Sequence, residues 1–169
     1  MAASSLLEKS EVIKISRVVF TTLAFIGALF QILITKAPPE KAFLFNFILF
    51  NIGFGGIFAF MEHYYRFNKG AAKICWQPGE FFRKPIPFFN LFLGILGILC
   101  IWFRKDFWTV TVIISSVFIF GHGCYELGKV QETVVNGNKP FYYTKFVLSF
   151  DLFFPVALIA LLVVDRTGM

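Results

Sequence analysis

Residues 18–35 read VVFTTLAFIGALFQILIT, a run without a single charged side chain. A helix of about 20 apolar residues crosses the roughly 30 Å hydrocarbon core of a bilayer, so this run has the length of a membrane span. Four similar runs follow, at residues 42–61, 86–103, 107–125 and 146–164. A backbone in lipid must satisfy its own hydrogen bonds, and none of these runs alternates apolar and polar residues. The sequence therefore predicts an all-α, polytopic integral membrane bundle of five transmembrane helices.

The composition points to the same class of protein. Of the 169 residues, 57% are hydrophobic and 15% are charged, and the mean hydropathy is +0.73. Soluble domains carry about 25% charged residues, which excludes a soluble enzyme, a nucleic-acid-binding domain and a disordered tail. The net charge of +6 is assigned to loops that face an anionic membrane surface. The expected partner is thus the lipid bilayer and not nucleic acid.

The distribution of Lys and Arg predicts the orientation. With five spans, residues 1–17 and the loops after the second and fourth spans share one side, and they hold eleven of the 16 basic residues. Positively charged segments stay on the cytoplasmic side, so the N-terminus is predicted to be cytoplasmic and the C-terminus to lie opposite. No cleavable signal peptide is expected. The chain is predicted to form one transmembrane domain with an amphipathic lead-in at 1–17, an interfacial or re-entrant segment at 70–84 and a linker-like stretch at 127–138.

Five ionisable residues lie at or just inside one predicted membrane boundary. Glu62 and His63 end the second span, His122 and Glu126 end the fourth, and Asp151 lies inside the fifth. An ionisable group within a span costs about 2.5–3.5 kcal/mol on insertion scales, so its presence needs an explanation. At 1.5 Å per residue the three spans bring these groups to a similar depth. The sequence thus predicts a polar cluster at the cytoplasmic-leaflet end of the bundle.

The residue types in this cluster suggest a metal site. Imidazoles and carboxylates that project from several helices of a bundle are ligands for Zn, Fe or Mn. The candidate metal ligands are His63, His122, Glu126 and Asp151, and the candidate catalytic acid/base groups are Glu62 and Glu80. The same groups would also suit a proton relay, or an acid/base site acting on a lipid-like substrate. Haem held between the two imidazoles is a further alternative.

Small residues along the second and third runs predict close helix packing. Gly55 shares a helical face with Asn51 and Glu62, and Gly56 lies beside it; Gly94 and Gly97 form a similar stripe. Small side chains let membrane helices approach closely. We therefore expect these stripes to face the interior of the bundle.

A pattern of mainly polar and small residues runs along the chain: His63, Ala72, Trp76, Pro78, Glu80, Asn90-Leu91, Gly94, Gly97, Gly121-His122, Asp151 and Pro155. This pattern resembles that of a family of uncharacterised small polytopic membrane proteins of bacteria and archaea. It covers roughly residues 53–155. Cys75 stands where the family has Gly, and the element around Pro78 is shorter than in the family. The resemblance implies shared polar positions at His63, Trp76, Glu80, Asn90, His122 and Asp151, of which Asn90 and Trp76 are the candidate ligand-binding residues.

Two other classes of function stay open. A non-catalytic structural or assembly subunit of a larger membrane complex would use the polar side chains only to hold helices together. A small transporter with five spans would have to work as a homo-oligomer, and the chain shows no inverted repeat. The first class predicts that each buried ionisable group is paired, within the chain or with a partner.

Overall fold

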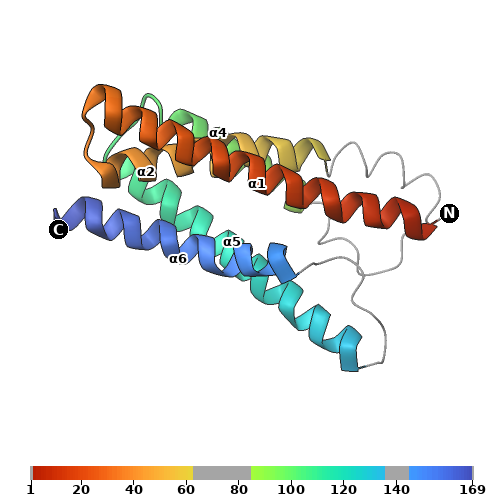
Figure 1. Ribbon diagram of the computed structural model, residues 1–169. Coiled ribbons are helices and arrows are strands. Elements are labelled where there is room, and N and C mark those ends of the chain that lie inside the picture. The colour runs from red at the N-terminus through yellow and green to blue at the C-terminus, as the bar shows by residue number, and fades with distance from the viewer. Residues whose placement is uncertain (1, 63–84, 136–144, 169) are drawn as a thin grey trace.

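A computed structural model describes residues 2–62, 85–135 and 145–168, and Figure 1 shows their arrangement. Within these ranges the chain forms helices and short connections, without a strand. The helices are α1 (Ala2–Thr35), α2 (Pro39–Phe47), α4 (Pro85–Leu99), α5 (Asp106–Val135) and α6 (Lys145–Thr167). A π-helix, η1 (Ile48–Phe54), continues α2 and is followed by a further helical stretch at 55–62. The all-α prediction is confirmed for this part of the chain.

Helix boundaries follow the sequence signals, with two differences. α2 begins at Pro39, where the missing backbone N–H costs nothing because first-turn N–H groups have no partner within the helix. The predicted lead-in and the first run form one continuous helix of 34 residues, α1. The linker-like stretch that begins at residue 127 is helical as far as Val135, where α5 ends. No proline interrupts this stretch, and the Asn136-Gly137 turn signal comes only after it.

Three helical stretches of the described chain are long and apolar enough to cross a membrane. They are Ile15–Thr35, Pro39–Glu62 and Asp106–Tyr125. The apolar part of α4, Pro87–Leu99, is shorter, because the chain leaves the helix at Cys100 and turns toward α5. α6 is not among the three. These helices indicate a membrane protein, and the predicted count of five spans is not confirmed.

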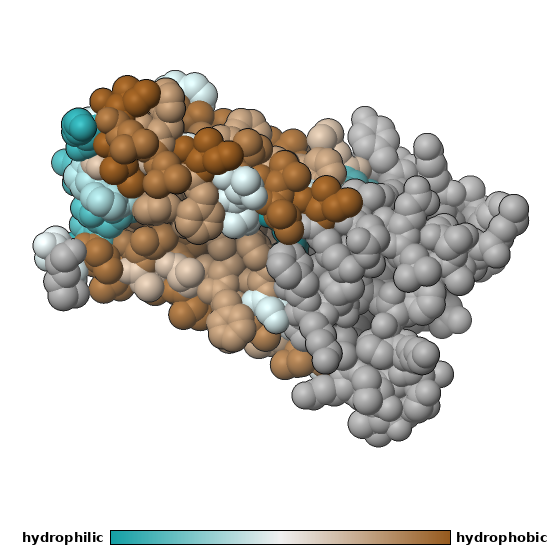
Figure 2. Space-filling model, viewed as in Figure 1, coloured by the Kyte–Doolittle hydropathy of each residue, from teal (hydrophilic) through white to brown (hydrophobic). Residues whose placement is uncertain are grey.

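Large apolar side chains cover the outside of the bundle. Phe30, Val117 and Phe153 are among the most exposed residues, whereas Ala24, Ala28 and the serines of α5 are buried. Figure 2 shows the apolar colours along the sides of the described helices, with hydrophilic residues gathered at the end where α1 turns into α2. Such a distribution suits contact with lipid, because bulky apolar groups then face hydrocarbon while small groups allow close helix packing.

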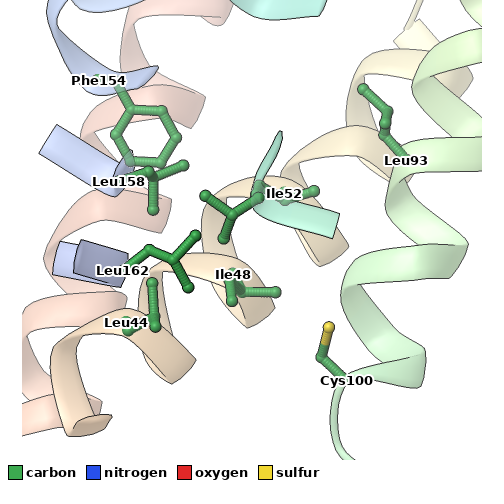
Figure 3. Packing of buried hydrophobic residues seen from close by; sticks show 9 residues of the cluster. Leu44, Ile48, Ile52, Leu93, Cys100, Phe154, Leu158 and Leu162 are labelled. Atoms are coloured by element: carbon green, nitrogen blue, oxygen red, sulfur yellow. The ribbon is translucent and has the colours of Figure 1, made fainter. Parts of the chain in front are cut away.

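The hydrophobic core lies between α6 and the continuous α2–η1 helix. Leu44, Ile48 and Ile52 of that helix pack opposite Phe154, Leu158 and Leu162 of α6 (Figure 3). α5 lies along α6, α1 lies on α2 and η1, and α4 packs on η1. One face of α6 is therefore enclosed by its neighbours, and Asp151 is buried on this helix.

α4 crosses η1 and the following stretch at backbone contact. A Cβ added to Gly97 would lie 2.5 Å from the Gly53 nitrogen, and one added to Gly56 would lie 2.7 Å from the Asn90 carbonyl oxygen. A Cβ on Gly94 would lie 2.8 Å from the backbone nitrogen of Ile57. The close packing predicted for the glycines of α4 is confirmed. Asn90 is thereby placed at this crossing.

The neighbouring glycines of this helix face two different helices. Gly53 and Gly56 lie at the crossing with α4, whereas the nearest atom outside its own helix to a Cβ added at Gly55 would be Cδ2 of Phe20 on α1, at 3.8 Å. Asn51 also faces α1, where it accepts a hydrogen bond from Thr21, so Asn51 and Gly55 share a face as their spacing predicts.

Candidate polar site between α1, α5 and α6

Asp151 is the charged residue buried deepest among those that the structure describes. It lies in the second turn of α6, and its side chain is 1% exposed. A carboxylate at this depth needs a partner, because desolvation of an unpaired charge is costly. The partner comes from the other end of the sequence: the Arg17 guanidinium on α1 donates a hydrogen bond from Nη1 to Oδ1 of Asp151. This ion pair joins the first and last helices.

Arg17 is held by a second contact on α6. Its guanidinium carbon lies 5.1 Å from the centre of the Phe150 ring, which gives a cation–π interaction. The Arg17 side chain is 26% exposed. Arg17 is therefore anchored to two successive residues of α6, while part of its side chain remains exposed.

The second carboxylate oxygen of Asp151 faces an imidazole. Nδ1 of His122, on α5, lies 3.8 Å from Oδ2 of Asp151. This separation is longer than a hydrogen bond, and it becomes an ion pair when the imidazole is protonated. The His122 ring stacks on Phe118, one turn earlier on the same helix, at a centroid distance of 6.4 Å. The Asp151 carboxylate thus has the Arg17 guanidinium at one oxygen and the His122 imidazole near the other.

Gly123 allows α5 to approach α6 at this level. A Cβ added to Gly123 would lie 3.1 Å from the Asp151 Cβ and 3.2 Å from Cδ2 of Leu152. A larger residue at position 123 would push the two helices apart. Because Gly123 has no side chain, α5 lies close to α6 at this level. The imidazole of the preceding residue, His122, thereby comes next to Asp151.

Buried hydroxyl groups continue along α5 toward the other end of the bundle. Thr111, Ser115 and Ser116 are all buried. The Ser116 hydroxyl donates to the carbonyl oxygen of Pro155 on α6 at 3.5 Å, and the Cys100 thiol donates to Oγ1 of Thr111 at 3.6 Å. Buried polar groups therefore continue along α5 well beyond the ion pair, and Ser116 among them contacts α6.

Two further hydrogen bonds hold α1 on the α2–η1 helix. The Thr21 hydroxyl donates to the side-chain oxygen of Asn51 at 3.0 Å, and the Asn46 amide donates to the side-chain oxygen of Gln31 at 2.9 Å. Together with Arg17 these residues give α1 one polar face along its length. Such a face fits the use of polar side chains to join membrane helices.

The residues predicted from the sequence have different positions in the structure. His122 and Asp151 are brought together, whereas half-buried Asn90 lies at the glycine crossing. Glu62 is half-buried at the last described position of its helix. Glu126 belongs to α5, but its side chain is outside the described part. His63, Trp76, Glu80 and the predicted interfacial segment 70–84 also lie outside the described residues.

The predicted metal site stays a prediction. No group of three or more His, Cys, Asp or Glu side chains that could hold a metal ion occurs among the residues that the structure describes. His122 and Asp151 provide two of the four predicted ligands, and the other two are not described. In the contact between Arg17 and Asp151, the guanidinium already occupies one of the carboxylate oxygens that a metal would use.

Arg17 is the site residue that sequence reasoning missed. Its position predicts one of the basic residues of the cytoplasmic segment, because the charge-free run begins one residue later, at Val18. One signal was available: Arg17 adjoins that run directly and is nearer to it than any other cation of residues 1–17. A cation in that position calls for an acid, and Asp151 was the only acid placed well inside a predicted span.

The fold and this cluster define a class: an all-α membrane-type bundle with a charged cluster enclosed by its first and last two helices. The model of the family of unknown function DUF6790 matches residues 15–168, and the chain belongs to this family. The predicted resemblance to a family without an assigned function is confirmed to that extent, over a longer stretch than residues 53–155. No curated protein and no solved structure matches the chain.

Proposed function

We propose that this chain is a multi-pass membrane protein whose bundle contains a proton-binding site formed by Asp151, His122 and Arg17. The observation that supports this proposal is the position of the Asp151 carboxylate, buried between a guanidinium and an imidazole that lies 3.8 Å away. An ionisable group within a membrane bundle is a functional candidate by default, and proton relays are one of its established uses.

The charges of the three groups leave Nδ1 of His122 and Oδ2 of Asp151 as the two atoms that can exchange a proton. Arg17 stays protonated, so with a neutral imidazole the cluster carries no net charge, as an apolar bundle requires. Histidine is the side chain that changes charge near neutral pH. Nδ1 of His122 lies 3.8 Å from Oδ2 of Asp151, and a small approach of the two groups allows a proton to pass between these two atoms. The site thus holds one exchangeable proton.

A structural role alone needs fewer groups than are present. Arg17 and Asp151 by themselves would neutralise each other and join α1 to α6. His122 adds a titratable group at the second carboxylate oxygen, and Gly123 gives it the room to be there. This arrangement supports proton binding over a purely structural ion pair.

The experiment uses the small number of histidines. The chain has two, so a His63→Gln variant leaves His122 as its single imidazole. In this background, ¹⁵N NMR of labelled histidine follows the protonation of His122 with pH, and infrared spectroscopy follows the carboxyl groups. We expect Asp151→Asn to change the titration curve of His122, because it removes the carboxylate charge whose Oδ2 lies 3.8 Å from Nδ1 of His122. Asp165→Asn removes a carboxyl group near the other end of α6 and should leave that curve unchanged.

Two results would contradict the proposal. One is a His122 titration curve that Asp151→Asn leaves unchanged. The other is about one transition metal bound per chain in purified wild-type protein and lost in His122→Ala, since coordinated imidazole does not exchange a proton freely. The second result would restore the metal site that the sequence predicts.

A further inference from the structure

Ser115 is the residue that extends the site. It lies on α5 between the Asp151 cluster and Thr111, its side chain is 0% exposed, and its hydroxyl oxygen has no hydrogen-bond partner in the described part of the chain. A buried hydroxyl without a partner is unusual in a native structure, and an ordered water is a common explanation. The surroundings of Ser115 are polar enough for one, because Ser116 and Thr111 are buried nearby on the same helix.

The buried polar groups form a row along α5. At 100° per residue, Thr111, Ser115 and His122 lie on one narrow stripe of α5, and the stripe is about 16 Å long. Ser116 connects it to α6 through the carbonyl oxygen of Pro155, which lies one turn after Asp151. At its far end Thr111 accepts from the Cys100 thiol. The row therefore runs from the charged cluster through about half of a 30 Å hydrocarbon core.

We infer that this row is a proton path, in which Ser116, Ser115, Thr111 and bridging waters carry protons between the Asp151–His122 site and the opposite face of the membrane. The inference rests on the proposed proton-binding site, which supplies and receives the protons. In each step an oxygen accepts a proton on a lone pair and passes its own proton to the next oxygen. One proton leaves the site, one emerges at the far end, and no electrons are transferred.

Proton flux through reconstituted liposomes tests the inference. Purified full-length protein is placed in liposomes that contain a pH-sensitive dye, and a potassium gradient with valinomycin drives protons inward. We expect acidification by the wild type above protein-free liposomes and loss of most of this flux in Ser115→Ala. Ser115→Thr keeps a hydroxyl and should retain the flux. Thr22→Val, which removes an exposed hydroxyl from α1, is the matched control and should behave as wild type.

The titration of His122 separates the two proposals. If Ser115→Ala loses the flux but keeps the wild-type titration curve of His122, the path is supported. A wild type without flux whose His122 still titrates together with Asp151 would overturn the path and leave the proton-binding site standing. Equal flux in Ser115→Ala and wild type would likewise overturn the path. Loss of the coupled titration in the wild type would remove the basis of both proposals.

Discussion

α6 carries an arginine–aspartate pair near each of its ends, and the two pairs lie in different surroundings. Near its start, Asp151 is 1% exposed and meets Arg17 of α1. Near its end, Arg166 is 41% exposed and meets Asp106 of α5 at 3.1 Å, and that aspartate is 95% exposed. The chemical groups are the same. The difference lies in how much water reaches the carboxylate, and this decides how much each pair contributes to stability.

Exposed and buried ion pairs differ in what their loss leaves behind. When one partner of an exposed pair is removed, water and salt ions solvate the other, so the cost is small. When one partner of a buried pair is removed, a charge remains in a medium that cannot solvate it. Arg17 and Asp151 thus depend on each other, whereas Arg166 and Asp106 do not.

The largest expected effect comes from breaking the buried pair. Arg17→Leu should destabilise the folded bundle by about 3–5 kcal/mol, because it leaves the Asp151 carboxylate, 1% exposed, without its partner. Asp151→Leu should cost less, because the Arg17 side chain that remains is 26% exposed and water can solvate it. The double variant Arg17→Leu with Asp151→Leu removes both charges and should recover a large part of the Arg17→Leu loss. Unfolding in mixed detergent micelles with increasing dodecyl sulfate measures the difference.

Additive losses in the double variant would contradict this account. If the two single losses simply add, Arg17 and Asp151 do not act as a pair, and their contact contributes nothing to the free energy of unfolding. If neither single change lowers stability, the buried pair contributes no more to stability than the exposed pair.

The second effect comes from separating the helices at the buried pair. Gly123→Leu should cost about 1–3 kcal/mol, because a side chain there must push Asp151 and Leu152 away from α5. Gly121→Leu is the matched control, since an added Cβ at position 121 meets nothing within 4 Å. The same detergent titration measures both variants. Equal stabilities would show that the α5–α6 approach does not depend on Gly123.

Much of the fold follows from the sequence because hydrophobicity acts over whole runs of residues. Each predicted run contains a helix, and the depth argument placed His122 and Asp151 at one level because helical rise is constant. What escaped prediction depends on local departures from that regularity. The π-helix at Ile48–Phe54 is one such departure, and Gly53 within it is the contact of Gly97 that the sequence did not single out. The hydrophobic periodicity of the sequence does not reveal such a change of helix type.

The candidate site was half predictable for a related reason. Burial of a charge can be inferred when it lies within an apolar run, as with Asp151, but Arg17 lies at a boundary where an arginine ordinarily reaches water. Its pairing is fixed by the packing of α1 against α6, helices separated by more than a hundred residues. Long-range contacts of this kind are not encoded in any single stretch of sequence.

The smallest expected effect tests the exposed pair and completes the comparison. Arg166→Gln removes the contact with Asp106 and a hydrogen bond to the Thr109 hydroxyl. We expect a loss of no more than about 1 kcal/mol in the detergent titration, and less at higher salt, because water solvates an aspartate as exposed as Asp106. A loss as large as that of Arg17→Leu would mean that burial does not determine how much each ion pair contributes to stability. The charged cluster at Asp151 would then be one helix contact among several, and the argument for a functional site there would lose its energetic support.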